Sequence, residues 1–141
     1  MGFRRNKKIV ARTPKELDAM QAAGEIVGEA LIACREAAKP GVSTLELDAI
    51  AEKTIRAAGA KPTFKGYEGF PGSICASVND IIVHGIPDEK TVLKDGDLIS
   101  IDCGATYKGW VGDSALTIEV GTVAADAKAV SYTHLRAHET P

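Results

Sequence analysis

Two aspartates stand eleven residues apart in apolar, β-prone sequence, Asp102 within residues 98–104 and Asp113 within residues 109–114. A carboxylate inside a strand needs a partner, because burying an unpaired charge is costly. Two carboxylates directed at one point repel each other, and a divalent cation between them removes both problems. The segment therefore predicts a β-hairpin and makes a metal-dependent enzyme the first hypothesis.

The register of this hairpin decides whether the two aspartates share a face. If residues 107–108 form the loop, Asp102 pairs directly with Asp113; if residues 108–109 form it, Asp113 pairs with Gly104, on the same face as Asp102. A three-residue loop places the two on opposite faces unless a bulge resets the register. The spacing thus permits convergence without proving it, and two solvent-facing aspartates remain the alternative.

Two capping boxes, at residues 13–16 and 43–46, predict two helices at the start of the chain. The first helix ends before residues 39–41, and the second ends at Gly59. The predicted apolar stripe of the first helix comprises Leu17, Met20, Ala23, Gly24, Val27, Leu31 and Cys34 or Arg35.

Strand patterns follow the two helices. Residues 73–78 read as a strand, residues 81–84 as a short return strand, and residues 98–120 as the hairpin of the two aspartates. Helices followed by meandering strands indicate an α+β fold with an antiparallel sheet, rather than a succession of βαβ units.

Composition places the chain among single soluble domains. It has 141 residues, of which 45% are hydrophobic and 26% charged, with a net charge of −2. These values predict neither nucleic-acid recognition nor a membrane partner. We expect residues 1–12 to form a basic, solvated arm, and the three cysteines without a CxxC motif suit a reducing cytoplasm.

The last segment, residues 131–141, has no apolar stripe and resembles translated adaptor sequence. His134 and His138 have the spacing of helical metal ligands. We nevertheless expect a non-native or disordered tail, so that the domain of interest covers residues 13–130.

Three single residues have both a structural and a functional interpretation. His84 ends the predicted return strand, either as a hydrogen-bonded strand-end histidine or as a group that holds substrate. Cys75 and Cys103 lie inside apolar strands, which favours structural burial.

The motifs in residues 66–80, 83–87, 96–97, 101–102 and 112–113 resemble those of the type I methionine aminopeptidase family, and the resemblance covers residues 9–130. It implies the pita-bread fold, in which two pseudo-symmetric α+β halves surround a dinuclear metal site. Asp102 and Asp113 would bind two divalent ions, of cobalt, manganese, iron or zinc. The remaining ligands would be one histidine and two glutamates from a second half, so the chain is expected to be an inactive N-terminal fragment.

The resemblance also implies the roles of five further residues. His84 would contact the substrate near the scissile amide, as a catalytic and substrate-binding residue. The pocket for a methionine side chain would be lined by Tyr67, Phe70 and Cys75, with Phe64 at a further pocket position. Soft and aromatic walls suit a thioether.

The function implied by this resemblance is removal of the initiator methionine from nascent proteins by water activated at the metal site. The enzyme would be a cytoplasmic monomer, with a transient ribosome contact of the basic arm left open. Two alternatives are a prolidase or proline aminopeptidase of the same fold, and a non-catalytic peptide-binding pita-bread module. Retention of Asp102, Asp113 and His84 disfavours the last.

Overall fold

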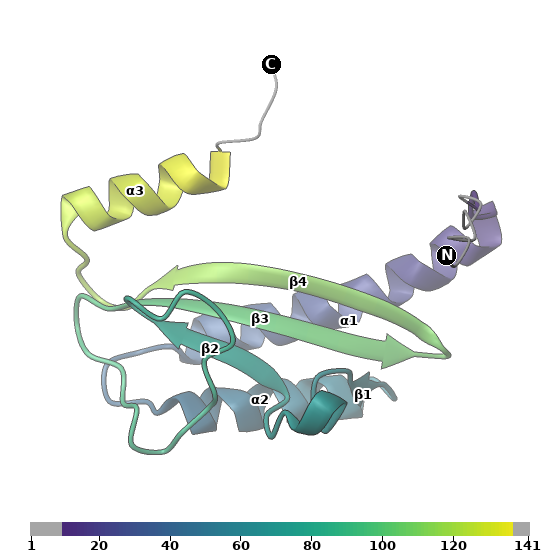
Figure 1. Cartoon of the computed structure of the whole chain (residues 1–141), viewed down its shortest axis with the longest axis horizontal. Coiled ribbons are helices and arrows are strands. Elements are labelled where there is room, and N and C mark those ends of the chain that lie inside the picture. The colour runs from purple at the N-terminus through teal and green to yellow at the C-terminus, as the bar shows by residue number, and fades with distance from the viewer. Residues whose placement is uncertain (1–9, 137–141) are drawn as a thin grey trace, which may run out of the picture.

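The computed structural model describes the backbone of residues 10–136 and the side chains of residues 10–132. Most of the basic arm, His138 and the side chain of His134 therefore lie outside the described part. The elements in chain order are α1 (Pro14–Ala37), α2 (Thr44–Ala57), β1 (Lys61–Pro62), the 3₁₀ turn η1 (Tyr67–Gly69), β2 (Ile74–Val78), β3 (Leu98–Tyr107), β4 (Trp110–Glu119) and α3 (Ala125–Arg136). Figure 1 shows α1 and α2 together behind one face of the sheet.

Both predicted capping boxes are confirmed. The Thr13 hydroxyl accepts a hydrogen bond from the Glu16 N–H at 3.3 Å, and the Glu16 carboxylate accepts one from the Thr13 N–H at 2.8 Å. Ser43 and Glu46 make the same exchange at 3.2 and 2.8 Å. Gly59, with φ +75°, ends α2 as predicted. Local sequence alone thus determines where both helices begin.

The predicted apolar stripe of α1 is wrong in its first two turns. Leu17 and Met20 are 52% and 38% exposed, and burial begins at Ala23. The helix backbone at Ala23 and Gly24 lies against Gly112 of β4, where an added Cβ would come within 2.7 Å. Leu17 and Met20 precede this contact, where α1 extends away from the sheet (Figure 1).

The four-stranded sheet is antiparallel and built around β3. Strands β1 and β2 pair with one edge of β3, and β4 pairs with the other along its whole length. The β3–β4 hairpin closes through Lys108 and Gly109, both at positive φ of 48° and 84°, as a type I′ turn requires. This register pairs Gly104 with Asp113, so the two-residue loop at 108–109 is the correct one of the predicted alternatives.

Side chains of β3 alternate between two environments. Ile99, Ile101, Cys103 and Ala105 are fully buried in the core under α1 and α2. Residues 100, 102, 104 and 106 therefore face the other way, onto what we call the open face. Figure 1 shows no helix of the described residues packed flat on this face.

The predicted return strand at residues 81–84 is wrong. Asn79 turns the chain away from β2 with φ +52°, and Ile81, Ile82 and Val83 are exposed. The chain returns to the edge of β2 only at Gly85, which accepts a hydrogen bond from the Ala76 N–H at 2.8 Å and donates one to Ser77 Oγ. The apolar run at residues 81–83 forms no strand ladder, because the returning chain bonds to the edge of β2 at Gly85 rather than along its length.

Helical backbone of α3 continues six residues beyond the predicted boundary at residue 130. Residues 131–136 therefore have helical backbone, and a non-native origin of residues 131–141 stays a prediction. The helical residues 131–136 contain neither glycine nor proline, so nothing in them interrupts a helix once begun. Across residues 10–136, each helix is either too short or too polar to cross a membrane.

Candidate metal centre

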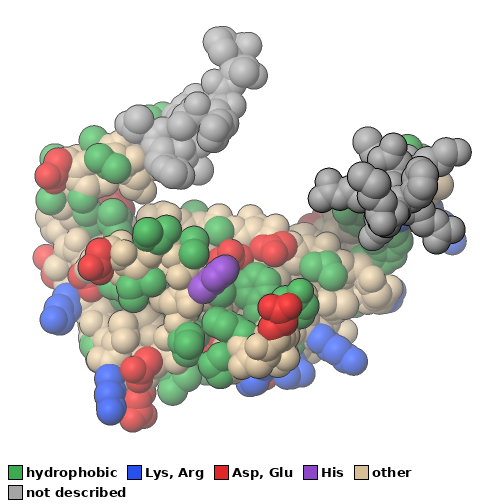
Figure 2. All heavy atoms as spheres, in the orientation of Figure 1, with side chains coloured by type: hydrophobic (Ala, Val, Ile, Leu, Met, Phe, Trp, Pro, Cys, Tyr) green, Lys and Arg blue, Asp and Glu red, His purple; other side chains and the backbone are tan. Residues whose placement is uncertain are grey.

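Asp102 and Asp113 lie side by side on the open face. Asp113 is paired with Gly104, and Asp102 lies two residues from Gly104 on the same strand. Figure 2 views this face, where acidic side chains and a histidine are surrounded by hydrophobic ones. Burial and the neighbouring Asp113 carboxyl together raise the pKa of Asp102 to about 6, and His84 partly offsets them. The two carboxyl groups therefore interact unfavourably when both are charged.

One oxygen of Asp102 shows that this face is electrostatically incomplete. Oδ1 is buried, and no hydrogen-bond donor among the described residues reaches it. Buried polar atoms without a partner are rare in folded proteins. A divalent cation would supply the missing positive partner and would also relieve the repulsion from Asp113. The two residues thus fit a cation on their chemistry.

The described residues supply only part of such a site. Among residues 10–132, no group of three or more His, Cys, Asp or Glu side chains is arranged to hold a metal ion. A divalent ion that prefers oxygen ligands usually takes six or more, including waters. By themselves, Asp102 and Asp113 would therefore be only part of such a site, and we call this pair the candidate half-site.

His84 stands at the rim of this half-site. Its side chain is exposed, its backbone is in the left-handed region at φ +57°, and it lowers the pKa of nearby Asp102. Gly85 holds it there, because a Cβ at that position would overlap the Ala76 carbonyl. The structure therefore brings His84 to the carboxylates through a single backbone contact rather than through a strand.

Cys75 borders the two carboxylates from β2. It is the cross-strand partner of Asp102 and is buried. Burial raises its pKa to about 11, with Asp102 and Asp113 adding to the effect, so the thiol is neutral. Cys103 is fully buried on the opposite face of the sheet. The predicted burial of both cysteines is confirmed.

The aromatic pocket candidates lie on the segment between β1 and β2. The ring of Phe64 covers Gly104, so tightly that an added Cβ would come within 2.6 Å of it. The ring of Phe64 therefore lies over the residue of β3 that pairs with Asp113. Phe70 is half-buried and Tyr67 is 68% exposed, and both belong to the loop that follows Phe64. The structure thus brings Phe64 and Cys75 to the carboxylates and leaves Tyr67 open to solvent.

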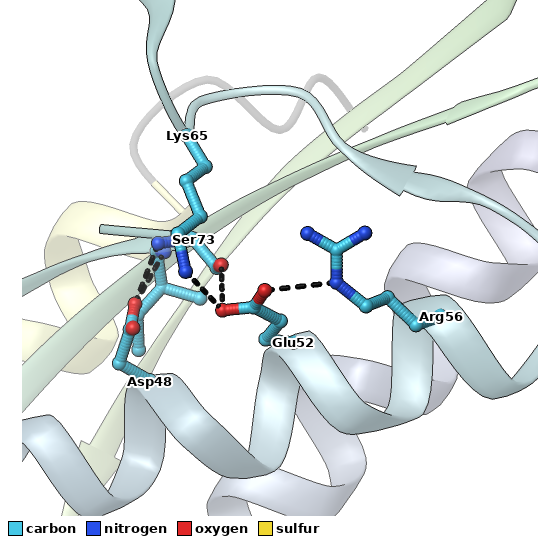
Figure 3. Close-up of polar contacts among 6 residues, drawn as sticks. Asp48, Glu52, Arg56, Lys65 and Ser73 are labelled. Carbon is cyan, nitrogen blue, oxygen red and sulfur yellow. Dashed lines mark hydrogen bonds and ion pairs between the residues drawn. The ribbon is translucent and has the colours of Figure 1, made fainter. Parts of the chain in front are cut away.

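Two acidic residues of α2 support this segment, and the sequence pattern did not reveal them. Oδ1 of buried Asp48 accepts hydrogen bonds from the N–H groups of Ser73 and Ile74, at 2.6 and 3.0 Å (Figure 3). Glu52, one turn later, binds Ser73 and two cations. The available signal was position: Asp48 directly follows Leu47, within the buried stripe of α2.

A comparison with known protein families bears on this pair of carboxylates. The sequence profile of metallopeptidase family M24 matches residues 18–140. The chain belongs to this family. Its α+β architecture of helices on one face of an antiparallel sheet is accordingly a partial pita-bread fold, as predicted.

Two relatives of this M24 chain are named as methionine aminopeptidases. Methionine aminopeptidase 1 of Mycobacterium tuberculosis is 55% identical over 128 residues, which are 90% of this chain and 48% of the relative. Methionine aminopeptidase of Rickettsia prowazekii superposes with a TM-score of 0.89 at 36% identity, covering 92% of this chain and 52% of that one. The chain therefore spans about half the length of the relatives it matches.

A solved prolidase is more distant. The enzyme from Pyrococcus furiosus has a TM-score of 0.77 at 25% identity, covering 89% of this chain and 36% of that one. Both similarities place the same fold here, but the sequence agreement is larger with the methionine aminopeptidases.

Proposed function

We propose that the protein carrying this sequence is a metal-dependent methionine aminopeptidase that removes the initiator methionine from nascent chains. The observation that carries the proposal is the pair of same-face carboxylates with an orphaned oxygen, Asp102 Oδ1. The names of the relatives support methionine as the substrate side chain, and the sequence agreement favours it over proline. The retained carboxylate pair also disfavours a non-catalytic peptide-binding module.

Asp102 and Asp113 would hold the metal, as two divalent ions of cobalt, manganese, iron or zinc. A divalent ion there would lower the pKa of a water and polarise the carbonyl of the scissile amide. The remaining ligands, one histidine and two glutamates, would come from a region of the relatives that this chain does not span. By itself, the 141-residue chain should therefore bind metal weakly and should not turn over.

The residues around the carboxylates would bind and orient the peptide. His84, exposed at the rim, would contact the substrate near the scissile amide. Phe64 and the neutral thiol of Cys75 would form the pocket walls next to the carboxylates, with Phe70 and Tyr67 closing it from the loop. Aromatic rings and sulfur favour a methionine thioether, and a buried apolar wall excludes a charged side chain.

The proposal places the enzyme in the cytoplasm as a monomer, where its three cysteines would stay reduced. All three are free in the structure. A ribosome contact of the basic arm is not needed for the chemistry.

The test is peptide cleavage by the complete gene product with added manganese or cobalt. Release of methionine from a Met-Ala-Ser peptide should fall at least about a hundredfold in Asp102→Asn and in Asp113→Asn, a loss of about 2.7 kcal/mol. Asp18→Asn, an exposed aspartate of α1, is the matched control and should keep full activity. Full activity in both site variants would overturn the proposal.

A further inference from the structure

One carboxylate of α2 joins both ends of the loop that carries Tyr67 and Phe70. We call residues 65–73 the pocket loop. Oε2 of Glu52 accepts a hydrogen bond from Lys65 Nζ at 2.6 Å and another from Ser73 Oγ at 3.0 Å (Figure 3). Oε1 of the same side chain accepts one from Arg56 Nε at 2.8 Å, within the helix. Glu52 thus closes the pocket loop at its base, from the side of the sheet opposite to the carboxylate pair.

The two ends of the pocket loop are not held equally. Ser73 is fixed independently, because its N–H and that of Ile74 both donate to buried Asp48. Lys65 is bound to the rest of the molecule by the Glu52 ion pair, with its side chain 44% exposed. On the other side, the Thr63 N–H donates to the Gly104 carbonyl at 3.0 Å and the Thr63 hydroxyl bonds to Thr106 at 2.9 Å, so the chain is fixed as far as Thr63. Beyond Thr63, Glu52 ties the Lys65 end of the loop.

The pocket loop is closed between these ends by backbone hydrogen bonds of its own. The Gly66 N–H donates to the Phe70 carbonyl at 2.8 Å, and the Phe70 N–H donates to the Tyr67 carbonyl at 2.9 Å. Gly66, Glu68 and Gly69 all adopt positive φ, which makes the turn tight. Tyr67 projects largely into solvent. The loop is thus a small closed unit, and its placement on the protein is decided at its base.

The base of the loop also separates the two pocket walls that adjoin the carboxylates. Phe64 directly precedes Lys65, and its ring rests on Gly104. Cys75 follows Ser73 by two residues and is held in the sheet as the partner of Asp102. Because Thr63 stays bound to Gly104 and Thr106, movement at Lys65 would turn Phe64 about this anchor while Cys75 stayed in place, and the space between the two walls would change.

We propose that Glu52 is a positioning residue that sets the width of the substrate side-chain pocket, by tying the Lys65 end of the pocket loop to its fixed Ser73 end. The inference rests on the proposed function for the identity of the pocket. It predicts that Glu52 narrows the pocket to an unbranched side chain without touching substrate. Loss of the tie should let Phe64 move off Gly104 and admit bulkier side chains.

The test compares variants that break different bonds of one carboxylate. Glu52→Ala removes the tie, Lys65→Met removes its mobile end, and Arg56→Ala breaks the bond that does not involve the loop. In the complete gene product, the ratio of kcat/KM for a Met-Ala-Ser peptide to that for a Leu-Ala-Ser peptide should fall about fivefold in the first two variants. Arg56→Ala should stay within about twofold of wild type. An unchanged ratio in Glu52→Ala, or an equal fall in Arg56→Ala, would overturn the inference.

A second readout does not require activity. In the 141-residue chain, the amide protons of Gly66 and Phe70 should exchange with solvent about fivefold faster in Glu52→Ala and Lys65→Met than in Arg56→Ala. If the complete gene product cleaves no methionine peptide but exchange rises as expected, the proposed function fails and the positioning role of Glu52 stands. Unchanged exchange in both loop variants refutes the positioning role itself.

Discussion

The two faces of the β3–β4 hairpin obey different rules. On the helix-covered face, Ile99, Ile101, Cys103 and Ala105 are fully buried and apolar. On the open face, the intervening positions hold Asp102 with its orphaned Oδ1 and a raised pKa. Because side chains alternate along a strand, a single sequence supplies stability on one side and an electrostatically unsatisfied surface on the other. The open face thus carries a carboxylate without a partner, whereas the helix-covered face is complete in itself.

On each face of the hairpin, a glycine permits a close contact. Gly112 lets the backbone of α1 approach β4 on the covered face, and Gly104 lets the ring of Phe64 lie against the open face beside Asp113. In each case the missing Cβ is replaced by a neighbour in close contact. The first contact builds the core, and the second builds a wall of the candidate pocket.

The largest expected effect is a difference in the free energy of unfolding between substitutions at two adjacent residues of β3. Ile101→Ala should reduce the free energy of unfolding by about 3 to 4 kcal/mol, because it opens a cavity under the helices. Ser100→Ala should cost about 0.5 kcal/mol, since it removes only an exposed hydroxyl contact with Thr117. Urea unfolding of the two variants measures both values, and similar losses would mean that the faces do not differ as described.

A smaller effect should come from two glycines that touch each other. Gly112→Ala should cost about 2 to 3 kcal/mol, because its Cβ would press on the backbone of Ala23 and Gly24. Gly24→Ala should stabilise the protein by about 0.5 to 1 kcal/mol, because a Cβ there meets nothing within 4 Å and alanine favours the helix. Thermal unfolding with opposite shifts in Tm supports the close approach of α1, and a stable Gly112→Ala variant contradicts it.

The carboxylate pair on the open face should make the stability of the metal-free chain depend on pH. The pKa of Asp102 is about 6 in the folded chain, against 3.8 for an unperturbed carboxyl. A raised carboxyl pKa means that the folded state binds the proton more tightly, so metal-free stability should fall as pH rises from about 4 through 6. Asp102→Asn should remove this fall and stabilise the metal-free chain at pH 7 by about 1 kcal/mol, after allowance for solvent screening.

Unfolding at pH 4 and pH 7 checks this prediction on wild type and Asp102→Asn. The variant should gain stability over wild type at the higher pH, with little difference at the lower. Equal pH profiles would show that the carboxyl pair is not under electrostatic strain.

Local patterns predicted the frame of the fold, since capping boxes and alternation act over a few residues. Thr13 and Ser43 began the helices as expected, and the type I′ turn at residues 108–109 was one of the alternatives for the hairpin. The sequence permitted Asp102 and Asp113 to share a face but could not fix the hairpin register, because the register depends on the backbone φ of Lys108. The proposed role of His84 comes from the family resemblance rather than from the spacing of motifs.

Long-range contacts explain what the sequence could not show. The run at residues 81–83 looks like a strand, but the edge of β2 is completed instead by Gly85 and by Asp48, 26 residues before Ile74. The tie between Glu52 and Lys65 spans 13 residues and follows no periodic pattern. Leu17 and Met20 continue the stripe of α1, yet they lie beyond the part of the helix that the sheet covers.

Mn²⁺ titration followed by electron paramagnetic resonance shows whether Asp102 and Asp113 together form half of a metal centre. The 141-residue chain should bind Mn²⁺ at its open face with a dissociation constant of about 1 mM, as expected for a site with few protein ligands. This binding should be lost in both Asp102→Asn and Asp113→Asn and kept in Asp18→Asn. Undiminished Mn²⁺ binding in the Asp102→Asn/Asp113→Asn double variant would contradict the account.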